Sequence, residues 1–521
     1  MSVSSPPTIR ASHVNSGTSV PADELPWPER RDRPVARLPK LHVEVDQRTR
    51  VTRFGGLSLA AQITRLLKIP QILDRHVHVL KRHLPYHESD HVLAQAFSLY
   101  CGGTCIEDMA HLQHDEPLLD LLGACRLPDP TTGGDFLRRF EFDENPRALW
   151  DLQRANDEIQ TKAWERIKKK QRQRRRRGRK KAETWTTVDM DGHLEETTGS
   201  QKEADFSRKG KWSYQPLAIS LGETGEVLAL RNRLGSVPAC SAASVVLQGC
   251  LQRVKGVFGK RVLTRADSEF DRADVRQACE AEGTYFALVG REFKNRPGIA
   301  EGVPEEDWSP FRTRAARARS ERKRAPGYRP RRKKVDLRQA RVAEKGWEEL
   351  VLLQQWVTEV SYVPAEDPSK TYRLVIRRQL IDHRQGQQTL FTEYRYRYVV
   401  TNLPESWSTA DVIDATYKRC DQEKVIQQLG AGVSAWRMPV AEFDGNSAWL
   451  EIARLAWNLG KWVAQLALPA EVVRWEWKRF RLAFVLVSAQ VVNKGRRLWL
   501  RLSSSHRFHE DLVSAHARLQ P

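Results

Sequence analysis

Two aspartates and a glutamate have the types and positions that phosphoryl transfer with divalent metal ions requires. Asp191 ends the extended segment WTTVDMDG, Asp267 follows the apolar run VLTRA, and Glu423 lies in the helical run ATYKRCDQEKVIQQL. Carboxylate oxygens from separate elements can hold two Mg²⁺ or Mn²⁺ ions, one activating an attacking hydroxyl and the other stabilising the leaving oxygen. This chemistry needs no covalent protein intermediate, so no nucleophilic serine, tyrosine or cysteine is required. The pattern predicts a two-metal site on these three carboxylates.

The first of these carboxylates has two candidates, Asp189 and Asp191, which would point to the same face of one strand. We prefer Asp191 because it stands before Gly192, where a strand ends and a groove can open. Asp189 would then support the metal site without contacting the ions directly. A single aspartate after a strand is more often a turn or cap residue, so the prediction depends on the joint placement of the carboxylates.

The helix that carries Glu423 has two further residues suited to DNA. Tyr417 and Arg419 precede the glutamate by six and four positions, so Arg419 and Glu423 share one face of a continuous helix. A guanidinium there could hold a phosphate beside the metal ligand. The alternative is a salt bridge between Arg419 and Glu423. Ser408 and Asp411 have the spacing of a capping pair, which predicts the start of this helix.

The charge of the chain predicts a polyanionic partner. Its 521 residues carry a net charge of +21, with a pI near 9.8. This excess of Lys and Arg supplies affinity without distinguishing DNA from RNA or an acidic membrane surface. The densest block is KKKQRQRRRRGRKK, from Lys168 to Lys181, which we interpret as a linker or a phosphate-contacting arm, a solvated tether being the alternative. The DNA contacts expected in this block are Arg174, Arg175, Arg176 and Arg177.

Cysteine usage and hydropathy predict a soluble protein of a reducing compartment. The seven cysteines are scattered and odd in number, which favours free thiols over a disulfide framework. The first 40 or so residues are rich in Ser, Pro and charge and contain no apolar leader, which is typical of a disordered arm. The most apolar stretch, Ser447–Leu468, contains Glu451, Arg454 and Lys461, so we expect a buried helix and no membrane span.

The elements that must position the carboxylates follow from the hydrophobic period. After the basic block, TWTTVDMDG, YQPLAISLG and EVLALRNR are extended, and a helical run covers Ala239–Val254. A strand ending at Asp267, the helical run DRADVRQACEAEG and a strand at Thr284–Gly290 complete the series. The order β-β-β-α-β-α-β is that of the ribonuclease H-like fold. The predicted class is α/β, with an RNase H-like mixed sheet, a β-rich insertion and a preceding all-helical domain.

This pattern divides the chain into seven segments. They are a disordered arm (1–50), a helical domain (51–165), a basic linker (166–182), the first part of the catalytic core (183–290), a basic and β-rich insertion (291–405), the second part of the core with the glutamate helix (406–470), and a C-terminal region (471–521). The helical domain is a candidate for DNA binding, but it has no clear helix-turn-helix signature, so a structural role stays open.

The chain resembles DDE transposases of bacterial insertion sequences, specifically the family named for insertion sequence thirteen-eighty. The resemblance covers most of residues 185 to 465. It implies an RNase H-like core with a β-rich insertion before the glutamate helix, and it implies Asp191, Asp267 and Glu423 as the metal-binding triad. The segments that carry it are VDMDGHLEETTGSQKEADFSRKGKWSYQPLAISLGETGE, RADSEF, VVTNL, RCDQEKVIQQLGAGVSAWRMP and AWLEIARLAWNLGKWV.

The chain departs from the family pattern at three points. His193 stands where members have Thr or Ser, which leaves the choice between Asp189 and Asp191 open. The interval from Tyr417 to the following arginine is one residue short, and Gly430 occupies the place of an expected lysine. The loss of that lysine removes one expected contact with the DNA backbone and leaves the metal chemistry intact.

The resemblance implies a cut-and-paste transposase of the bacterial cytoplasm, associated with the nucleoid when bound. Such an enzyme binds the terminal inverted repeats of its element in double-stranded DNA, cleaves their ends and joins the 3′-hydroxyls to target DNA. It uses two Mg²⁺ ions, which Mn²⁺ can replace, and acts at least as a homodimer because both ends must be held together. The competing interpretations are an RNase H-like nuclease without strand joining and a non-catalytic DNA-binding descendant.

Overall fold

The computed structural model describes residues 43, 44, 46, 49–175, 185–198, 201–293, 295–313, 341, 344–386, 388–495 and 497–520. The chain separates into two compact units, 1–49 and 50–521. Nearly all of the first unit, where the sequence predicts a disordered arm, lies outside the described residues. The fold and the candidate site both belong to the second unit.

The N-terminal part of the second unit is helical, as its apolar spacing predicts. No strand occurs in the described stretch 53–175. Local side chains begin some of these helices: the carboxylate of Asp129 accepts from the Thr132 amide at 3.0 Å, and Asp115 caps the preceding helix in the same way. The helices are α1 (Leu57–Leu67), α2 (Ile69–His76), α3 (Glu88–Cys101), α4 (Ala110–Gln113), α5 (Glu116–Leu122), α6 (Pro130–Arg138) and α7 (Ala148–Arg175).

Helix α7 differs from the sequence prediction, because it continues into the basic block expected to be a linker. Lys168 donates to the carbonyl of Val257, and Lys170 donates to that of Gln465 at 3.2 Å. Both carbonyls lie in the last turns of helices, where they lack intrahelical partners and where positive charge is favoured. These long-range contacts keep the first part of the block helical as far as Arg175. The remainder of the block lies outside the described residues.

A nine-stranded mixed sheet forms the centre of the unit, in the order β10-β11-β12-β13-β9-β8-β2-β6-β7. The first three long strands along the chain, β2, β6 and β7, are antiparallel, and β8 and β9 then continue parallel to β2. The predicted order of core strands and helices is therefore present. Their bounds are β2 (Thr186–Gly192), β6 (Leu217–Leu221), β7 (Val227–Arg231), α8 (Ala243–Phe258), β8 (Val262–Ala266), α9 (Ala273–Ala281) and β9 (Tyr285–Gly290).

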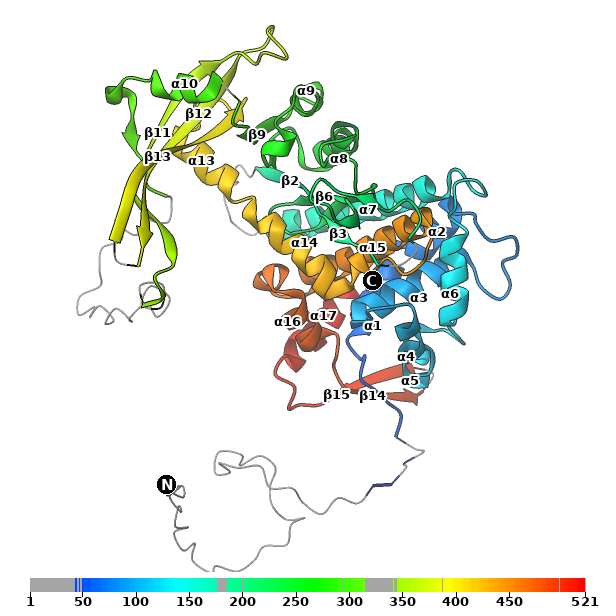
Figure 1. Ribbon diagram of the computed structural model, residues 1–521. Helices are drawn as coiled ribbons and strands as arrows, with labels where there is room; N and C mark the ends of the chain where they lie inside the picture. The colour runs from blue at the N-terminus through cyan, green and yellow to red at the C-terminus, as the bar shows by residue number, and fades with distance from the viewer. Residues whose placement is uncertain are drawn as a thin grey trace, which may run out of the picture. The chain divides into compact units, whose positions relative to one another are not determined.

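Two further β structures interrupt this series. A small sheet that the sequence did not predict lies between β2 and β6, formed by β3 (Glu195–Glu196), β4 (Asp205–Phe206) and β5 (Trp212–Tyr214). The β-rich insertion extends the main sheet, because β13 pairs with β9 along Tyr398–Thr401 (Figure 1). Its elements are α10 (Asn295–Glu301), β10 (Ser309–Pro310), β11 (Glu348–Tyr362), β12 (Tyr372–Gln385) and β13 (Gln388–Thr401).

Helices cover both faces of the sheet. Alternate residues of the central strands point to opposite layers: Leu263 packs toward α13, while Val262 joins the larger core with α7 and α15. Figure 1 shows α13 and α14 in succession, leading from the inserted strands toward the body that contains α15. The C-terminal elements are α13 (Thr409–Tyr417), α14 (Cys420–Val433), α15 (Phe443–Ala467), α16 (Trp477–Phe484), β14 (Ala489–Lys494), β15 (Arg497–Leu502) and α17 (His509–Leu519).

Helix α15 is the buried helix that the sequence predicts. Two of its charged side chains are paired inside the protein: the carboxylate of Glu451 lies 3.1 Å from the guanidinium of Arg454, which also reaches Asp157 at 2.6 Å. This pairing allows charge to be buried in an apolar helix. Lys461 instead donates to the carbonyl of Val473 at 3.1 Å. No helix in the described part of the chain has the length and apolarity to cross a bilayer.

Candidate active site

The strand register brings the two aspartates together. In the parallel pair β2 and β8, Asp189 lies opposite Arg265 and Met190 opposite Ala266. One step further, Asp191 and Asp267 leave the ends of these neighbouring strands side by side. Burial raises the pKa of Asp191 to about 6, and the nearby carboxylate of Asp267 adds to this rise. Like charges held this close repel each other, which a divalent cation would relieve.

Asp189 forms a buried ion pair with Arg265. Its side chain is buried, and its two oxygens accept from the Nε and Nη2 atoms of Arg265, each at 2.7 Å. Arg265 also donates to the carbonyl of Ala415 at 2.8 Å, so it connects β2, β8 and α13. A carboxylate held on both oxygens by a buried guanidinium is a poor metal ligand. The geometry therefore favours Asp191 over Asp189 as the ligand.

The turn that follows β8 holds Asp267 in place. The Oδ1 atom of Asp267 accepts from the amide of Glu269 at 3.0 Å, which caps a short 3₁₀ helix over Ser268–Phe270. Arg291 supports this turn by donating to the carbonyls of Ser268 and Glu269 at 2.8 and 2.9 Å. The second carboxylate oxygen of Asp267 accepts no hydrogen bond from any described residue, so it is available to a ligand.

Glu423 reaches the same end of the sheet through its neighbour Gln422. The amide of Gln422 donates to the carbonyl of Ala218 at 3.2 Å and accepts from the hydroxyl of Ser220. Ala218 is the residue paired with Asp191 across β2 and β6. The first turn of α14 is thus anchored beside Asp191, with the Glu423 side chain exposed. The oxygens of the three carboxylates are not all within 4.8 Å of one another, but the charge of Glu423 contributes to the raised pKa of Asp191.

Arg419 does not form the helical pair with Glu423 that the sequence allowed. The predicted continuous helix is interrupted: α13 ends at Tyr417 and α14 begins at Cys420. Arg419 precedes α14, and its Nη1 atom lies 3.3 Å from Oδ2 of Asp191. The guanidinium opposes the rise in the pKa of Asp191. From this position between the two helices, Arg419 is a counter-ion of the first carboxylate.

The other residues expected to contact DNA have different positions. Tyr417 is half-buried and packs in the smaller core, with the guanidinium of Arg377 5.2 Å from its ring centroid. Burial raises the pKa of its hydroxyl. Arg174 and Arg175 form the end of α7, but their side chains lie outside the described residues, as do Arg176 and Arg177 entirely.

Trp436 contacts two of the three positions at which the sequence departs from the pattern of the family it resembles. Its ring centroid lies 4.6 Å from that of His193, just beyond β2. A Cβ atom on Gly430 would lie 2.6 Å from Cδ1 of Trp436, so the indole occupies the space into which a lysine would project. Sequence reasoning missed Arg265, Gln422 and Trp436. The first had a signal, since Arg265 precedes Asp267 by the same interval as Asp189 precedes Asp191.

Residues 36–521 match the family described as Transposase DDE domain group 1. The protein is a DDE transposase. None of the curated proteins compared with it matches. Among solved structures, the transposase is similar to one titled piggyBac transposase synaptic complex with hairpin DNA, with 11% identity, a TM-score of 0.29 and 82% of each chain covered. That likeness is too distant to assign any residue. Domains of this family generally use divalent metal ions, for which carboxylate oxygens are suitable ligands.

Proposed function

We propose that this transposase binds the terminal inverted repeats of an insertion sequence of the thirteen-eighty family, cleaves the element ends and joins them to target DNA. The observation that carries the proposal is the adjacency of Asp191 and Asp267 at two parallel strand ends, with Glu423 anchored beside them through Gln422. The strand order β7-β6-β2-β8-β9, with the inserted strands before the glutamate helix, supports an RNase H-like core.

Asp191, Asp267 and Glu423 would hold two Mg²⁺ ions, which would activate the attacking hydroxyl and stabilise the leaving oxygen. Neighbouring residues hold the three carboxylates in position and balance their charge. The pair of Asp189 with Arg265 holds the two strand ends in register and connects them to α13. Arg419 neutralises Asp191, and its guanidinium becomes available to a DNA phosphate once that carboxylate has another counter-charge.

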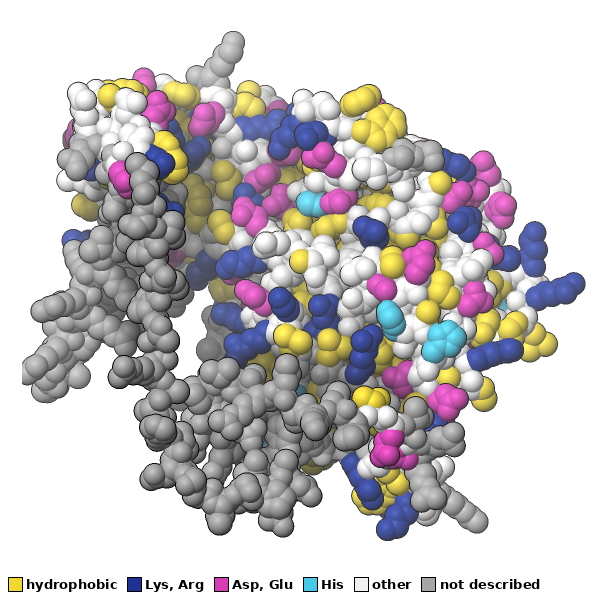
Figure 2. All heavy atoms as spheres, turned by 60° about the horizontal axis from the view of Figure 1, so that its bottom comes forward, with side chains coloured by type: hydrophobic (Ala, Val, Ile, Leu, Met, Phe, Trp, Pro, Cys, Tyr) yellow, Lys and Arg dark blue, Asp and Glu magenta, His cyan; other side chains and the backbone are white. Residues whose placement is uncertain are grey.

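Double-stranded DNA is the partner that the charge of the transposase favours. Lys and Arg side chains recur across the face in Figure 2, and the net charge of +21 would raise the local concentration of any polyanion. We infer that the arginines at 174 to 177 contact the DNA backbone, and that Tyr417 acts indirectly, by supporting Arg377. A homodimer on DNA would hold both ends of the element.

Three substitutions test the proposal: Asp191→Asn, Asp267→Asn and Glu423→Gln. Each preserves side-chain size and removes one ligand charge, so cleavage of labelled repeat ends should be lost while binding to those ends is retained. Asp421→Asn is the matched control, because Asp421 is an exposed acid in the same turn of α14 and pairs only with Lys424 at 3.0 Å among the described residues.

Equal cleavage by Glu423→Gln and the Asp421→Asn control would refute the assignment. Adding a target plasmid separates the activities: joined products identify a transposase, whereas cuts without joining identify a nuclease. If the wild-type protein shifts the labelled DNA in a gel and does not cut it, DNA binding is the one activity that the assay supports.

A further inference from the structure

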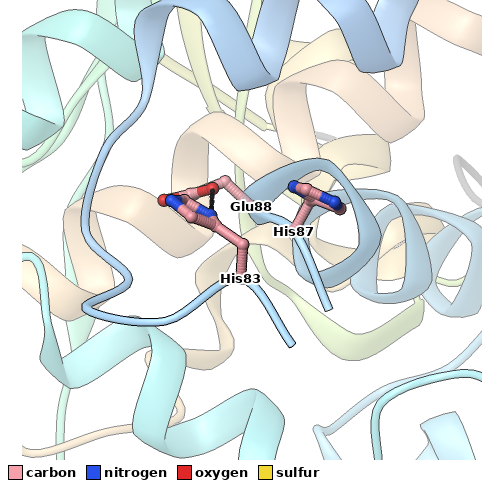
Figure 3. A group of neighbouring side chains, drawn as sticks. All are labelled: His83, His87 and Glu88. Carbon is pink, nitrogen blue, oxygen red and sulfur yellow. Dashed lines mark ion pairs between the residues drawn. The ribbon is translucent and has the colours of Figure 1, made fainter. Parts of the chain in front are cut away.

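A second cluster of ligand-type side chains lies in the helical N-terminal part, on residues that the proposed reaction does not use. In the described part of the chain, His83, His87 and Glu88 form the one group of three whose ligand atoms all lie within 4.8 Å of one another. Figure 3 shows the three side chains at the start of α3 and in the loop before it. The cluster is independent of the proposed carboxylate site.

Glu88 gives this cluster a fixed, buried anchor. The residue is 1% exposed, and its Oε1 atom accepts from the amides of Val79 and Leu80 at 3.2 and 3.1 Å. These two bonds hold the carboxylate in one orientation. Its Oε2 atom faces the imidazole of His83, whose Nδ1 atom lies 3.3 Å away. A buried carboxylate oriented by backbone amides is what a metal ligand needs from its supporting groups.

His87 is oriented in a similar way. It is the residue before α3, where its carbonyl accepts from the amide of Asp90 at 3.1 Å and its own amide donates to the Asp90 carboxylate at 2.8 Å. These bonds fix the backbone of His87 and leave the two nitrogens of its imidazole available to a ligand. The rings of His83 and His87 lie 5.4 Å apart and are inclined by only 20°.

We propose that His83, His87 and Glu88 bind one Zn²⁺ ion, which clamps the loop at residues 77–87 to the start of α3. Two imidazoles and a carboxylate form a ligand set that suits Zn²⁺, with water at the fourth position. Zinc bonds of about 2.0–2.1 Å in a tetrahedron separate neighbouring ligand atoms by roughly 3.3 Å. The distance between His83 Nδ1 and Glu88 Oε2 has this value. The exposed ring of His87 offers a third ligand atom within 4.8 Å of one on each of the other two residues.

The test measures Zn²⁺ bound to the full-length protein after chelation and dialysis against Zn²⁺ with excess Mg²⁺. Two variants remove a ligand and keep the local structure. Glu88→Gln retains an oxygen acceptor for the two backbone amides, and His87→Asn retains a good cap for α3. Each should bind the ion at least about tenfold more weakly than the wild-type protein. Added Zn²⁺ should raise the melting temperature of the wild type and leave both variants unchanged.

Two controls separate this site from other zinc ligands. His78→Asn changes an exposed histidine of the same loop, and Asp267→Asn changes the proposed catalytic site. Both should keep the ion and its effect on the melting temperature. The proposal is overturned if the wild-type protein binds no more Zn²⁺ than Glu88→Gln and His87→Asn, or if Asp267→Asn loses the ion. Retained DNA cleavage by Asp267→Asn, with intact zinc binding, would count against the proposed function alone.

Discussion

Replacing Asp189 or Asp191 by asparagine should have opposite effects on the stability of the metal-free transposase. The two residues lie two positions apart on β2, and each substitution removes one negative charge without changing side-chain size. Asp189 is paired on both oxygens with Arg265, whereas Asp191 lies against the carboxylate of Asp267. Burial raises the pKa of both carboxylates. The charge of Asp189 has a buried partner in Arg265, whereas that of Asp191 has a like charge beside it, despite the opposition of Arg419.

Asp189→Asn leaves the guanidinium of Arg265 buried without its counter-ion. Loss of one partner of a buried ion pair costs about 3–5 kcal/mol. For Asp191, the folded-state pKa of about 6 exceeds the ordinary value of 3.8. This difference corresponds to roughly 3 kcal/mol of destabilisation when the carboxylate is ionised. Asp191→Asn should remove that cost at neutral pH.

The raised pKa of Asp191 also predicts how the stability of the folded protein changes with pH. Between the unfolded-state and folded-state pKa values of Asp191, the folded protein binds more protons than the unfolded chain. Stability therefore falls as pH rises from about 4 to about 6, and the loss is complete above that range. The Asp191→Asn variant should lack this fall, so it should match the wild type near pH 4 and exceed it at pH 7.

Thermal melting in a chelating buffer measures both effects. For 521 residues, an unfolding entropy near 2 cal/mol/K per residue makes 1 kcal/mol equivalent to about 1 °C. Asp189→Asn should melt about 3–5 °C below the wild type at pH 7, and Asp191→Asn up to about 3 °C above it. If Asp191→Asn is as destabilised as Asp189→Asn, Asp191 has a structural role and the assignment of the two aspartates is wrong.

Three further outcomes test the surroundings of the site. Arg419→Ala should raise the pKa of Asp191 further, so the acidic limb of the cleavage rate should move to higher pH; an unchanged profile would contradict the contact between them. Gly430→Lys, which restores the family lysine, should destabilise by about 1–3 kcal/mol because its Cβ would meet Trp436, and denaturant unfolding should show relief when Trp436→Ala is added. Arg454→Met should cost about 3–5 kcal/mol in denaturant unfolding, because it leaves buried acidic partners unpaired; a near-neutral change would show that this ion pair does not stabilise α15.

Much of the core could be predicted from the sequence because its signals are local. The alternation of apolar residues identified the strands that end near Asp191 and Asp267, and the pair Ser408 and Asp411 marked the first residue of α13. Apolar spacing with a few charges identified α15 as a buried helix. Each of these features depends on residues within one or two turns or strands, where side-chain period and capping chemistry act directly.

Only the tertiary structure decided which charged groups meet. The register of β2 against β8 paired Asp189 with Arg265 and left Asp191 beside Asp267. The packing of α14 beside β2 and β6 brought Arg419 to a carboxylate 228 positions away. In the same way, the carbonyl of Val257 at the end of α8 accepts from Lys168, and this contact helps to keep the start of the basic block helical. Local periodicity carries no information about such partners, because strand register and ion pairing are set by contacts between segments far apart in the chain. The sequence alone thus determined the types of residue available for metal chemistry, and the fold determined which of them converge.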